Sequence, residues 1–495
     1  MKTILLQVRR CSIDRGLSNP VMRPAPIGYL GQGFTASSLK RVLPLIALAW
    51  CVQVQAAAPA ITSISLGAEG STNQTVVDRF TLGYSTEMES ATVNALANYD
   101  LRGAGGDGVF GNDDDVRSYV LGSPGYSSGL SNTFVISNGP LQPGWYRFTA
   151  TTNLTDRAGN RLAANFVRTF WVVPRAGFTI ENRDNDNSAG ATPLTLVEDP
   201  SGLRWRVGQG NLATSSDVDW WVFNGSAGQV VAVAMDAPGD PPGANWSCTL
   251  YRPDGNSLTG IGCYPRGTLG PVTLPDAGEY RVQVSRYSTW YPAEYWVRVS
   301  VAVPPVQMES EDNGAVSKAN PLVLAPGLGG SQTARVAGCV ETNDTAGDYF
   351  ALGTLGAGVT VNLDLTQPAS SPLVGQLTLY KEGTYVALGN DGETHLGYVI
   401  PGGEGGQYYA RVKAAQASYG VLSQYVLNVN VTNDVVRPVI TGVSFGAEGS
   451  TNQGVVDRFT LTFSEDMHAA TVNALTSYDL RGAGGDGVFG NDDDV

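Results

Sequence analysis

The densest group of oxygen-bearing side chains lies in the segment GAGGDGVFGNDDDV, which spans Gly103–Val116 and recurs at Gly482–Val495. Its candidate metal ligands are Asp107, Asn112, Asp113, Asp114 and Asp115. The interspersed glycines let the backbone turn tightly and expose carbonyl oxygens. Calcium takes roughly six to eight oxygen ligands, often from flexible acidic segments. The segment lacks the ligand spacing of an EF-hand, and the sequence therefore predicts either a calcium loop or a solvated acidic turn.

A second candidate is the aromatic segment RYSTWYPAEYW, which begins at Arg286 between two expected strands. Tyr287, Trp290 and Tyr291 would give it a large, rigid contact area if they are exposed, as suits a carbohydrate or protein ligand. The alternative is that these rings pack in a core or against a hairpin.

Catalytic constellations are scarce in this chain. It has two histidines, His395 and His468, and no nucleophile-elbow, zinc-protease or phosphate-loop motif. The net charge of −14 argues against nucleic acid as a partner, because phosphates need a basic surface. The sequence therefore predicts a protein that is not an enzyme and does not bind nucleic acid.

The N-terminal region has the plan of an export signal. Lys40 and Arg41 precede the short apolar run Val42–Cys51, and small residues follow up to a plausible cleavage point after Ala56. This run is too short to cross a bilayer core of about 30 Å, and no later run is long enough. We therefore expect residues 1–56 to be an export region and the protein to be secreted or at the cell surface, with no transmembrane span.

Two cysteines fit an exported protein. Cys248 and Cys263 flank a segment with the turn residues Pro-Asp-Gly, so their thiols could face each other across a hairpin and form a disulfide. The alternative is a pair of small buried thiols.

Alternation with a period of two marks the elements that would position these groups. Tyr280, Val282 and Val284 alternate with polar residues, and turn-forming clusters recur along the chain. Only the segment 88–97 reads as a short helix. The pattern predicts an all-β protein built of tandem β-sandwiches.

A long internal repeat organises the chain. Residues 61–116 match residues 440–495 at 44 of 56 positions. The first copy continues through further expected strands to about residue 173, whereas the second copy coincides with the last residues of the sequence. A sandwich without half its strands would expose its core, so we expect the sequence to be a fragment of a longer repetitive protein.

A second repetition lies within that period. The segment Glu181–Leu194 aligns with Glu309–Leu322, and each is followed by an aromatic strand and a tyrosine-rich pair of strands. The expected organisation is an export region at 1–56, β-sandwiches at 57–175, 176–304 and 305–435, and a truncated repeat at 436–495.

These segments resemble two bacterial families. The unit at 57–175, with VDRFTLGYSTEM, ATVNALANYDLRG and LQPGWYRFTATTNLTDRAGNRLA, resembles the Ig-like domains of cell-surface proteins. The units at 176–304 and 305–435 resemble the bacterial pre-peptidase C-terminal domain, a jelly-roll-like sandwich. That likeness rests on their opening Glu/Asn cluster, the DWWVF or DYF strand and the final tyrosine-containing strands.

The second resemblance implies a calcium site. In collagen-binding members of that family, an acidic N-terminal segment and aspartates before the aromatic strand bind calcium. The matching residues of the 305–435 unit are Glu309, Glu311, Asn313 and Asp348, and those of the 176–304 unit are Glu181, Asn185, Asp217 and Asp219. In the 176–304 unit Arg183 stands where the middle acid would be, which weakens that site. The alternative is that Asp and Asn serve as turn residues.

Both resemblances imply a non-catalytic role. The first reading is an exported stalk or adhesive array of β-sandwiches, stabilised by calcium. The second is the accessory region of a larger secreted hydrolase, with modules that bind polysaccharide or a collagen-like substrate. The expected partner is thus an extracellular protein or a polysaccharide.

Overall fold

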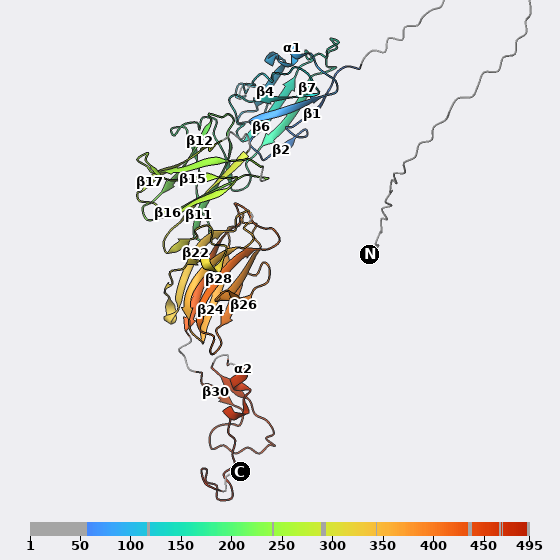
Figure 1. Cartoon of the computed structure of the whole chain (residues 1–495). Coiled ribbons are helices and arrows are strands. Elements are labelled where there is room, and N and C mark those ends of the chain that lie inside the picture. The colour runs from blue at the N-terminus through green and yellow to red at the C-terminus, as the bar shows by residue number, and fades with distance from the viewer. Residues whose placement is uncertain are drawn as a thin grey trace, which may run out of the picture. The chain divides into compact units, whose positions relative to one another are not determined.

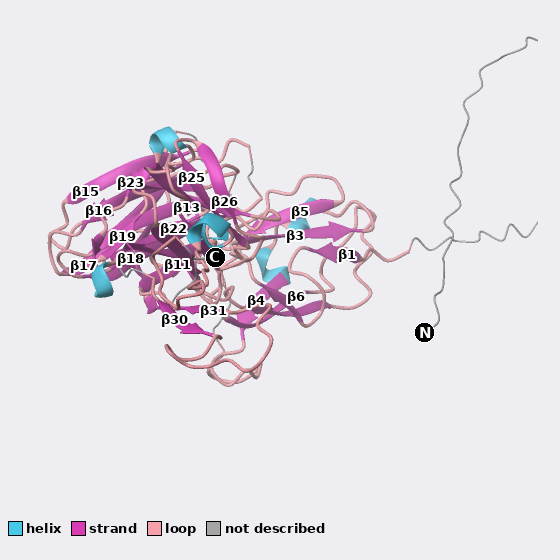
Figure 2. Cartoon of the chain, turned by 90° about the horizontal axis from the view of Figure 1, so that it is seen from below, coloured by secondary structure: helices cyan, strands magenta, loops and turns pink. Residues whose placement is uncertain are grey.

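The computed structural model describes residues 57–115, 119–239, 242–288, 294–342, 344–433, 438–464, 467 and 469–492. The expected export region at 1–56 lies outside the described residues. The described chain is almost entirely strand and loop, with a few one-turn helices (Figure 2). The predicted all-β class of tandem sandwiches is confirmed. No helix in the described part of the chain is long and apolar enough to cross a membrane.

Residues 57–173 form the first sandwich, whose two sheets enclose an aromatic core (Figure 1). One sheet has the order β1 (Ile61–Ile64), β3 (Arg79–Tyr84), β5 (Ser131–Val135). The other has the order β2 (Ser71–Asn73), β7 (Phe166–Val172), β6 (Gly144–Ala150), β4 (Tyr99–Gly103). The expected short helix is α1 (Ser90–Val93), followed by a 3₁₀ turn at Leu96–Asn98.

Residues 178–302 form the second sandwich. Its first sheet has the order β10 (Val197–Glu198), β11 (Leu203–Asn211), β18 (Glu294–Ala302), β13 (Val230–Asp236), β16 (Gly267–Thr273), and β8 (Phe178–Ile180) also pairs with β11. Its second sheet has the order β15 (Ser257–Cys263), β14 (Trp246–Tyr251), β17 (Gly278–Arg286), β12 (Val218–Gly225), β9 (Thr192–Pro193).

Residues 306–433 form the third sandwich. Its first sheet has the order β19 (Val306–Met308), β22 (Gln332–Cys339), β29 (Gln424–Asn433), β24 (Val359–Thr366), β27 (His395–Val399), and β21 (Ala325–Pro326) also pairs with β22. Its second sheet has the order β20 (Asn320–Pro321), β23 (Asp348–Leu355), β28 (Gly406–Ala414), β25 (Gly375–Lys381), β26 (Thr384–Leu388). Single 3₁₀ turns lie at Val316–Lys318 and Leu328–Gly330.

The second and third sandwiches share a topology. In each, a short strand at the entrance (β8 or β19) runs parallel to the long strand β11 or β22, which pairs antiparallel with the last long strand, β18 or β29. The predicted alternation holds, because Tyr280, Val282 and Val284 are fully buried between the sheets of the second sandwich. The shared topology accounts for the internal repetition of the sequence.

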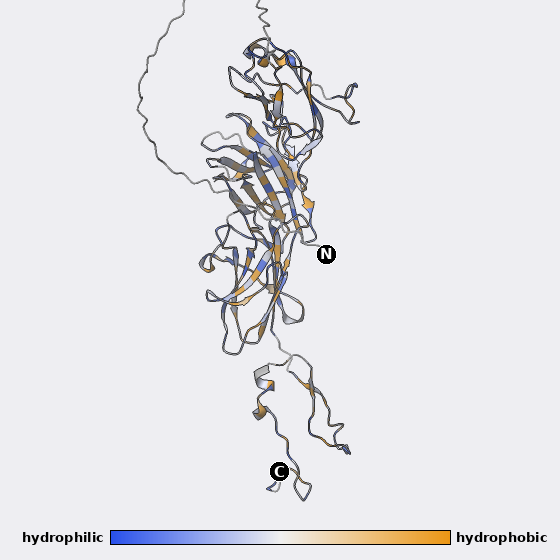
Figure 3. Ribbon diagram, turned by 90° about the vertical axis from the view of Figure 1, so that its right-hand side faces the viewer, coloured by the Kyte–Doolittle hydropathy of each residue, from blue (hydrophilic) through white to orange (hydrophobic). Residues whose placement is uncertain are grey.

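The terminal repeat, residues 438–492, has a different environment from its first copy. It contains β30 (Ile440–Val443), β31 (Leu461–Phe463), α2 (Ala469–Val472) and a 3₁₀ turn at Leu475–Ser477. Leu101 is fully buried against β6 in the first sandwich, whereas its counterpart Leu480 is 74% exposed. Apolar residues therefore lie along an open ribbon in this segment (Figure 3). The cause is physical: β5, β6 and β7, which cover the first copy, have no counterpart in residues 438–492.

Candidate functional site

Two carboxylates and a tyrosine meet inside the entrance of the third sandwich. Glu309 follows β19, Asp348 begins β23 and Tyr425 lies near the start of β29. The Tyr425 hydroxyl is 2.7 Å from Asp348 Oδ2 and 3.2 Å from Glu309 Oε2. Glu309 also accepts a hydrogen bond from the backbone N–H of Cys339. A side chain at Gly338 would collide with both Tyr425 and Glu309, which explains the glycine there.

The second sandwich builds the same arrangement at the same place in its fold. The Tyr295 hydroxyl donates to Asp219 Oδ2 at 2.6 Å, and Glu181 accepts from the backbone N–H of Asn211 at 3.2 Å. Gly210 is the counterpart of Gly338, since a side chain there would collide with Glu181 and Tyr295. The predicted pairs Glu181 with Asp219 and Glu309 with Asp348 are thus brought together in space.

Burial dominates the electrostatics of both pairs. Glu181, Asp219, Glu309 and Asp348 are at most 7% exposed. Loss of hydration disfavours the ionised carboxylate and raises the pKa of Glu309 and Asp348 well above the usual values, and nearby acids raise them further. The pKa values of Glu181 and Asp219 are raised for the same reasons. Each pair therefore costs free energy unless it holds a proton or a cation.

The two pairs differ in how their oxygens are used. In the second sandwich Asp219 accepts from Tyr295 and Glu181 accepts from Asn211, and no buried oxygen of either carboxyl lacks a hydrogen-bond partner. In the third sandwich the buried Oδ1 atom of Asp348 has no hydrogen-bond partner. An unpartnered buried carboxylate oxygen is costly, so the third sandwich has an acceptor that is still available.

More acidic groups surround the third-sandwich pair. A pocket of about 350 Å³ is lined by residues that include Glu311, Asn313 and Asp344. Burial and the charges of Glu341 and Asp344 raise the pKa of Glu311 to about 8. Asp344 Oδ1 accepts from the backbone N–H of Gly347 at 2.9 Å, while its Oδ2 atom is buried without a partner.

Asp344 and Asp186 are two acids that our sequence reasoning missed. Asp344 lies four residues before Asp348, the aspartate that opens the aromatic strand. Aligning the two units places no acid of the second sandwich opposite it. In the second sandwich, the charge of Asp186 raises the pKa of Asp217 and Asp219, after the larger effect of burial on each. Asp186 thus supplies an acid where Arg183 interrupts the motif, while the Arg183 guanidinium lies 4.3 Å from the ring centre of Tyr119 in the first sandwich.

The donor chemistry of the third-sandwich site suits a hard cation such as calcium, because it consists of carboxylate and amide oxygens. Two of these oxygens, on Asp344 and Asp348, have no hydrogen-bond partner. Within the described ranges, however, no three His, Cys, Asp or Glu side chains are already gathered as a metal cage. The oxygen ligands and the two unpartnered carboxylate oxygens therefore suit calcium, and calcium binding stays a prediction.

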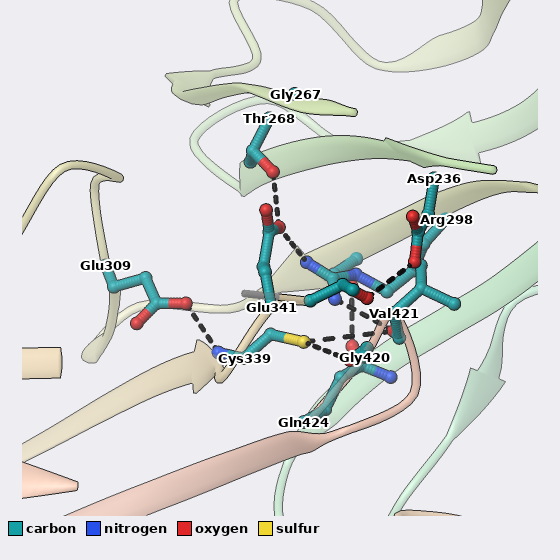
Figure 4. Close-up of polar contacts among 12 residues, drawn as sticks. Asp236, Gly267, Thr268, Arg298, Glu309, Cys339, Glu341, Gly420, Val421 and Gln424 are labelled. Carbon is teal, nitrogen blue, oxygen red and sulfur yellow. Dashed lines mark hydrogen bonds and ion pairs between the residues drawn. The ribbon is translucent and has the colours of Figure 1, made fainter. Parts of the chain in front are cut away.

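A buried ion pair joins this site to the second sandwich (Figure 4). Arg298 of β18 is 3% exposed, and its guanidinium lies 3.6 Å from Glu341 Oε1 and donates to the carbonyl oxygen of Val421 at 2.9 Å. Burial raises the pKa of Glu341, and the neighbouring Arg298 charge opposes this effect. Thr268 also donates to Glu341. Arg298 is therefore a fixed positive charge beside the acidic pocket.

In the acidic loop of the first sandwich, carboxylates accept hydrogen bonds from backbone N–H groups of the same loop. Asp114 Oδ2 accepts from the backbone N–H of Gly106 at 2.9 Å, and Asp107 Oδ1 accepts from that of Val109 at 2.8 Å. Asp115 Oδ2 accepts from Gly111 and lies 3.4 Å from Arg102, whereas the buried Oδ1 atom of Asp115 has no hydrogen-bond partner. These bonds are those expected of a structured acidic turn. The other predicted ligands, Asn112 and Asp113, lie on the same loop, and calcium there stays a prediction.

Only part of the predicted aromatic segment lies within the described residues. Tyr287 is 54% exposed and packs edge-to-face on Tyr264 at 4.9 Å, whereas Trp290 and Tyr291 lie outside the described residues.

The predicted disulfide is not formed in the structure, in which Cys248 and Cys263 are free, buried thiols. The register explains this, because Cys248 lies opposite Ile261 and Cys263 lies opposite Trp246. The two thiols are therefore diagonal neighbours on the hairpin and pack in the core of the second sandwich.

Comparison with known families identifies one domain of this chain. Residues 217–286 match the bacterial pre-peptidase C-terminal domain. The match covers the strands from β12 to β17 and includes Asp217 and Asp219. It places one such domain in the second sandwich, while the likeness of the third sandwich to the same family and of the first to Ig-like domains stays a prediction.

Among curated proteins, no sequence matches this chain. Similar solved structures include a periplasmic inhibitor of g-type lysozyme from Aeromonas hydrophila, with 13% identity, a TM-score of 0.18, and coverage of 25% of this chain and 98% of that chain. Another is the CBM22 tandem domain of Xyn10C from Paenibacillus barcinonensis, with 12% identity, a TM-score of 0.15, and coverage of 48% and 92%. These TM-scores are too low to support an argument about function.

Proposed function

We propose that this chain is an exported, non-catalytic modular protein whose third sandwich is stabilised by a calcium ion. The observation that supports this most directly is the buried, unpartnered Oδ1 atom of Asp348 beside Glu309, Glu311 and Asp344. These four side chains would hold the ion, and the bound ion would neutralise carboxylates that otherwise repel one another. The chain's own residues then act as a fixed scaffold that presents the surfaces of the sandwiches to an extracellular partner.

The non-catalytic role is supported by the environment of the chain's titratable groups. His395 begins β27 (His395–Val399), and its Nδ1 atom lies 2.7 Å from Asp364 Oδ1 with both side chains more than half exposed. The strongly shifted acids are buried structural pairs. We therefore assign the chain to spacing and binding, as an adhesive or stalk-like array.

The second candidate is the accessory region of a secreted hydrolase, and the match of residues 217–286 to a pre-peptidase domain favours it. The gene sequence downstream of codon 495 distinguishes the two roles. Further sandwich repeats there support the array, whereas a catalytic domain supports the accessory role.

Thermal unfolding of the full chain in calcium and in EDTA tests the calcium proposal. Calcium at about one hundred times its Kd should stabilise the native state by about 2.7 kcal/mol. Asp348→Asn should remove this response, and the matched Asp219→Asn should keep it, because no buried oxygen of Glu181 or Asp219 lacks a hydrogen-bond partner. An unchanged melting temperature of the unmodified chain in millimolar calcium would refute the proposal.

A further inference from the structure

The outer face of the first sandwich carries two tryptophans side by side. Trp145 of β6 lies directly opposite Trp171 of β7, and their ring centres are 4.7 Å apart. Their strand neighbours Tyr146 and Phe170 point inward and are buried. Neither indole belongs to the core cluster of this sandwich, and Trp171 is 42% exposed. The fold therefore does not need these rings for its core.

The acidic loop extends this aromatic row. Phe110, at the tip of the loop that follows β4, lies 6.4 Å from Trp145 between ring centres. The Arg147 guanidinium, also on the outer face of β6, is 4.6 Å from the centre of the Phe110 ring. The loop's internal hydrogen bonds from Gly106 and Gly111 to Asp114 and Asp115 hold it in this position. One consequence of the acidic turn is thus to place a third ring on the face.

Charged and polar side chains border the row. Arg102 lies next to Arg147 across the β4–β6 pair and forms ion pairs with Asp100 at 2.6 Å and Asp115 at 3.4 Å. Thr169, next to Arg147 across the β6–β7 pair, is bonded to Glu69. The two guanidinium groups are offset by the carboxylates of Asp100 and Asp115, and Glu69 and the other aspartates of the acidic loop add negative charge. The face therefore has no excess positive charge to attract a polyanion.

We propose that the Trp171–Trp145–Phe110 row on the outer face of the first sandwich binds a neutral polysaccharide. A pyranose ring presents an apolar C–H face that packs on aromatic rings, and its hydroxyls both donate and accept hydrogen bonds. The face offers both elements: rigid aromatic area and, beside it, oriented guanidinium and carboxylate groups. The absence of excess positive charge favours a neutral chain of sugars over an anionic one.

A protein partner fits this face less well. Protein interfaces are centred on a desolvated apolar core from which charged residues are depleted, whereas charged side chains lie directly beside these rings. The inference is independent of the calcium proposal, because none of its residues belongs to the third sandwich.

Isothermal titration calorimetry of the full chain with cellohexaose, xylohexaose and chitohexaose tests the proposal, with EDTA present throughout. We expect at least one hexasaccharide to bind with a Kd below about 1 mM, a modest affinity for a small ligand on an open face. Trp171→Ala should weaken binding by about tenfold or more, and Trp171→Phe should restore most of it. The matched control Tyr385→Ala, which removes a 65% exposed ring from the third sandwich, should have no effect.

Two outcomes would overturn the proposal. One is that none of the three hexasaccharides binds at concentrations of about 10 mM, well above the expected Kd. The other is that Trp171→Ala binds as tightly as the unmodified chain. If Trp171→Ala instead abolishes self-association in sedimentation experiments while no sugar binds, the face is a protein interface and the proposal is wrong.

Discussion

The second and third sandwiches differ in how they accommodate two buried carboxyl groups. Both bury a glutamate and an aspartate beside a tyrosine hydroxyl at the entrance of the fold. In the second sandwich no buried oxygen of Glu181 or Asp219 lacks a hydrogen-bond partner. In the third, an oxygen of Asp348 has no partner, and Arg298 from the neighbouring sandwich lies beside the acidic pocket.

This difference shows that a shared sequence motif does not determine a shared role. Trp221 of the second sandwich donates its indole N–H to Tyr295 at 3.1 Å, and the Tyr295 hydroxyl donates to Asp219. Phe350 occupies the corresponding inward position of β23 and has no such donor. Asp219 thus ends a chain of hydrogen bonds, whereas Asp348 keeps a buried oxygen without a partner. The following predictions test that distinction.

The largest effect should come from the buried ion pair. Arg298→Met leaves Glu341 buried without its partner and should destabilise the chain by about 3–5 kcal/mol. The double variant Arg298→Met/Glu341→Leu should recover much of that loss, because it removes both buried charges. Urea-induced unfolding measures both. Equal stabilities of the single variant and the unmodified chain would show that Arg298 is not needed to offset the acidic pocket.

The two glycines that accommodate the carboxyls give a matched pair of tests. Gly338→Ala and Gly210→Ala should each cost about 1–3 kcal/mol, because an added methyl group collides with a buried tyrosine and glutamate. Only Gly338→Ala should also reduce the calcium response, since only the third sandwich is proposed to bind the ion. A calcium response that survives Gly338→Ala but fails in Gly210→Ala would reverse our assignment of the two sites.

The raised pKa of Glu311, about 8 in the folded chain, predicts a pH dependence. Between its unfolded value of 4.5 and about 8, the folded state binds more protons than the unfolded state. The contribution of Glu311 to stability in EDTA should therefore be largest below pH 4.5 and fall as pH rises to 8, by at most about 1.4 kcal/mol per pH unit. Saturating calcium, which binds the ionised form, should flatten this fall.

Glu311→Gln is the control for that pH profile. This variant should reduce the fall of stability with pH in EDTA. Part of the fall should remain, because the buried acids of the second sandwich also titrate with raised pKa values. Identical pH profiles for Glu311→Gln and the unmodified chain would contradict the assignment of the titration to this residue.

The smallest effect concerns the acids outside the motif. Asp344→Asn should weaken calcium binding by about tenfold, or about 1.4 kcal/mol, because affinity falls as anionic ligands are removed. The matched variant Asp186→Asn in the second sandwich should leave calcium affinity unchanged. Calorimetric titration measures both, and the reverse order of effects would place the ion in the second sandwich.

Local patterns predicted the strands and part of the sites. The alternation of Tyr280, Val282 and Val284 sufficed for a buried strand, because side chains alternate faces in any strand. The family resemblance assigned Glu309 and Asp348 to one site, and in the structure both contact Tyr425. The sequence did not predict their tyrosine partner, because Tyr425 is 116 residues from Glu309 and contacts it only through the pairing of β22 with β29.

Other features depended on register and packing that no local pattern specifies. The expected disulfide failed because the strands align Cys248 with Ile261, which is a property of the hairpin register. Trp145 and Trp171 read as ordinary strand residues until the sheet places them together on its outer face. The terminal repeat shows the same limit, because Leu480 has the sequence context of buried Leu101 but lacks its covering strands.

Calorimetric titration of the metal-free full chain with calcium at pH 8 tests the central claim most directly. Our account predicts one ion bound in the third sandwich per chain, with binding lost in Asp348→Asn and retained in Asp219→Asn. Absence of any binding heat at millimolar calcium, together with unchanged thermal stability, would contradict it.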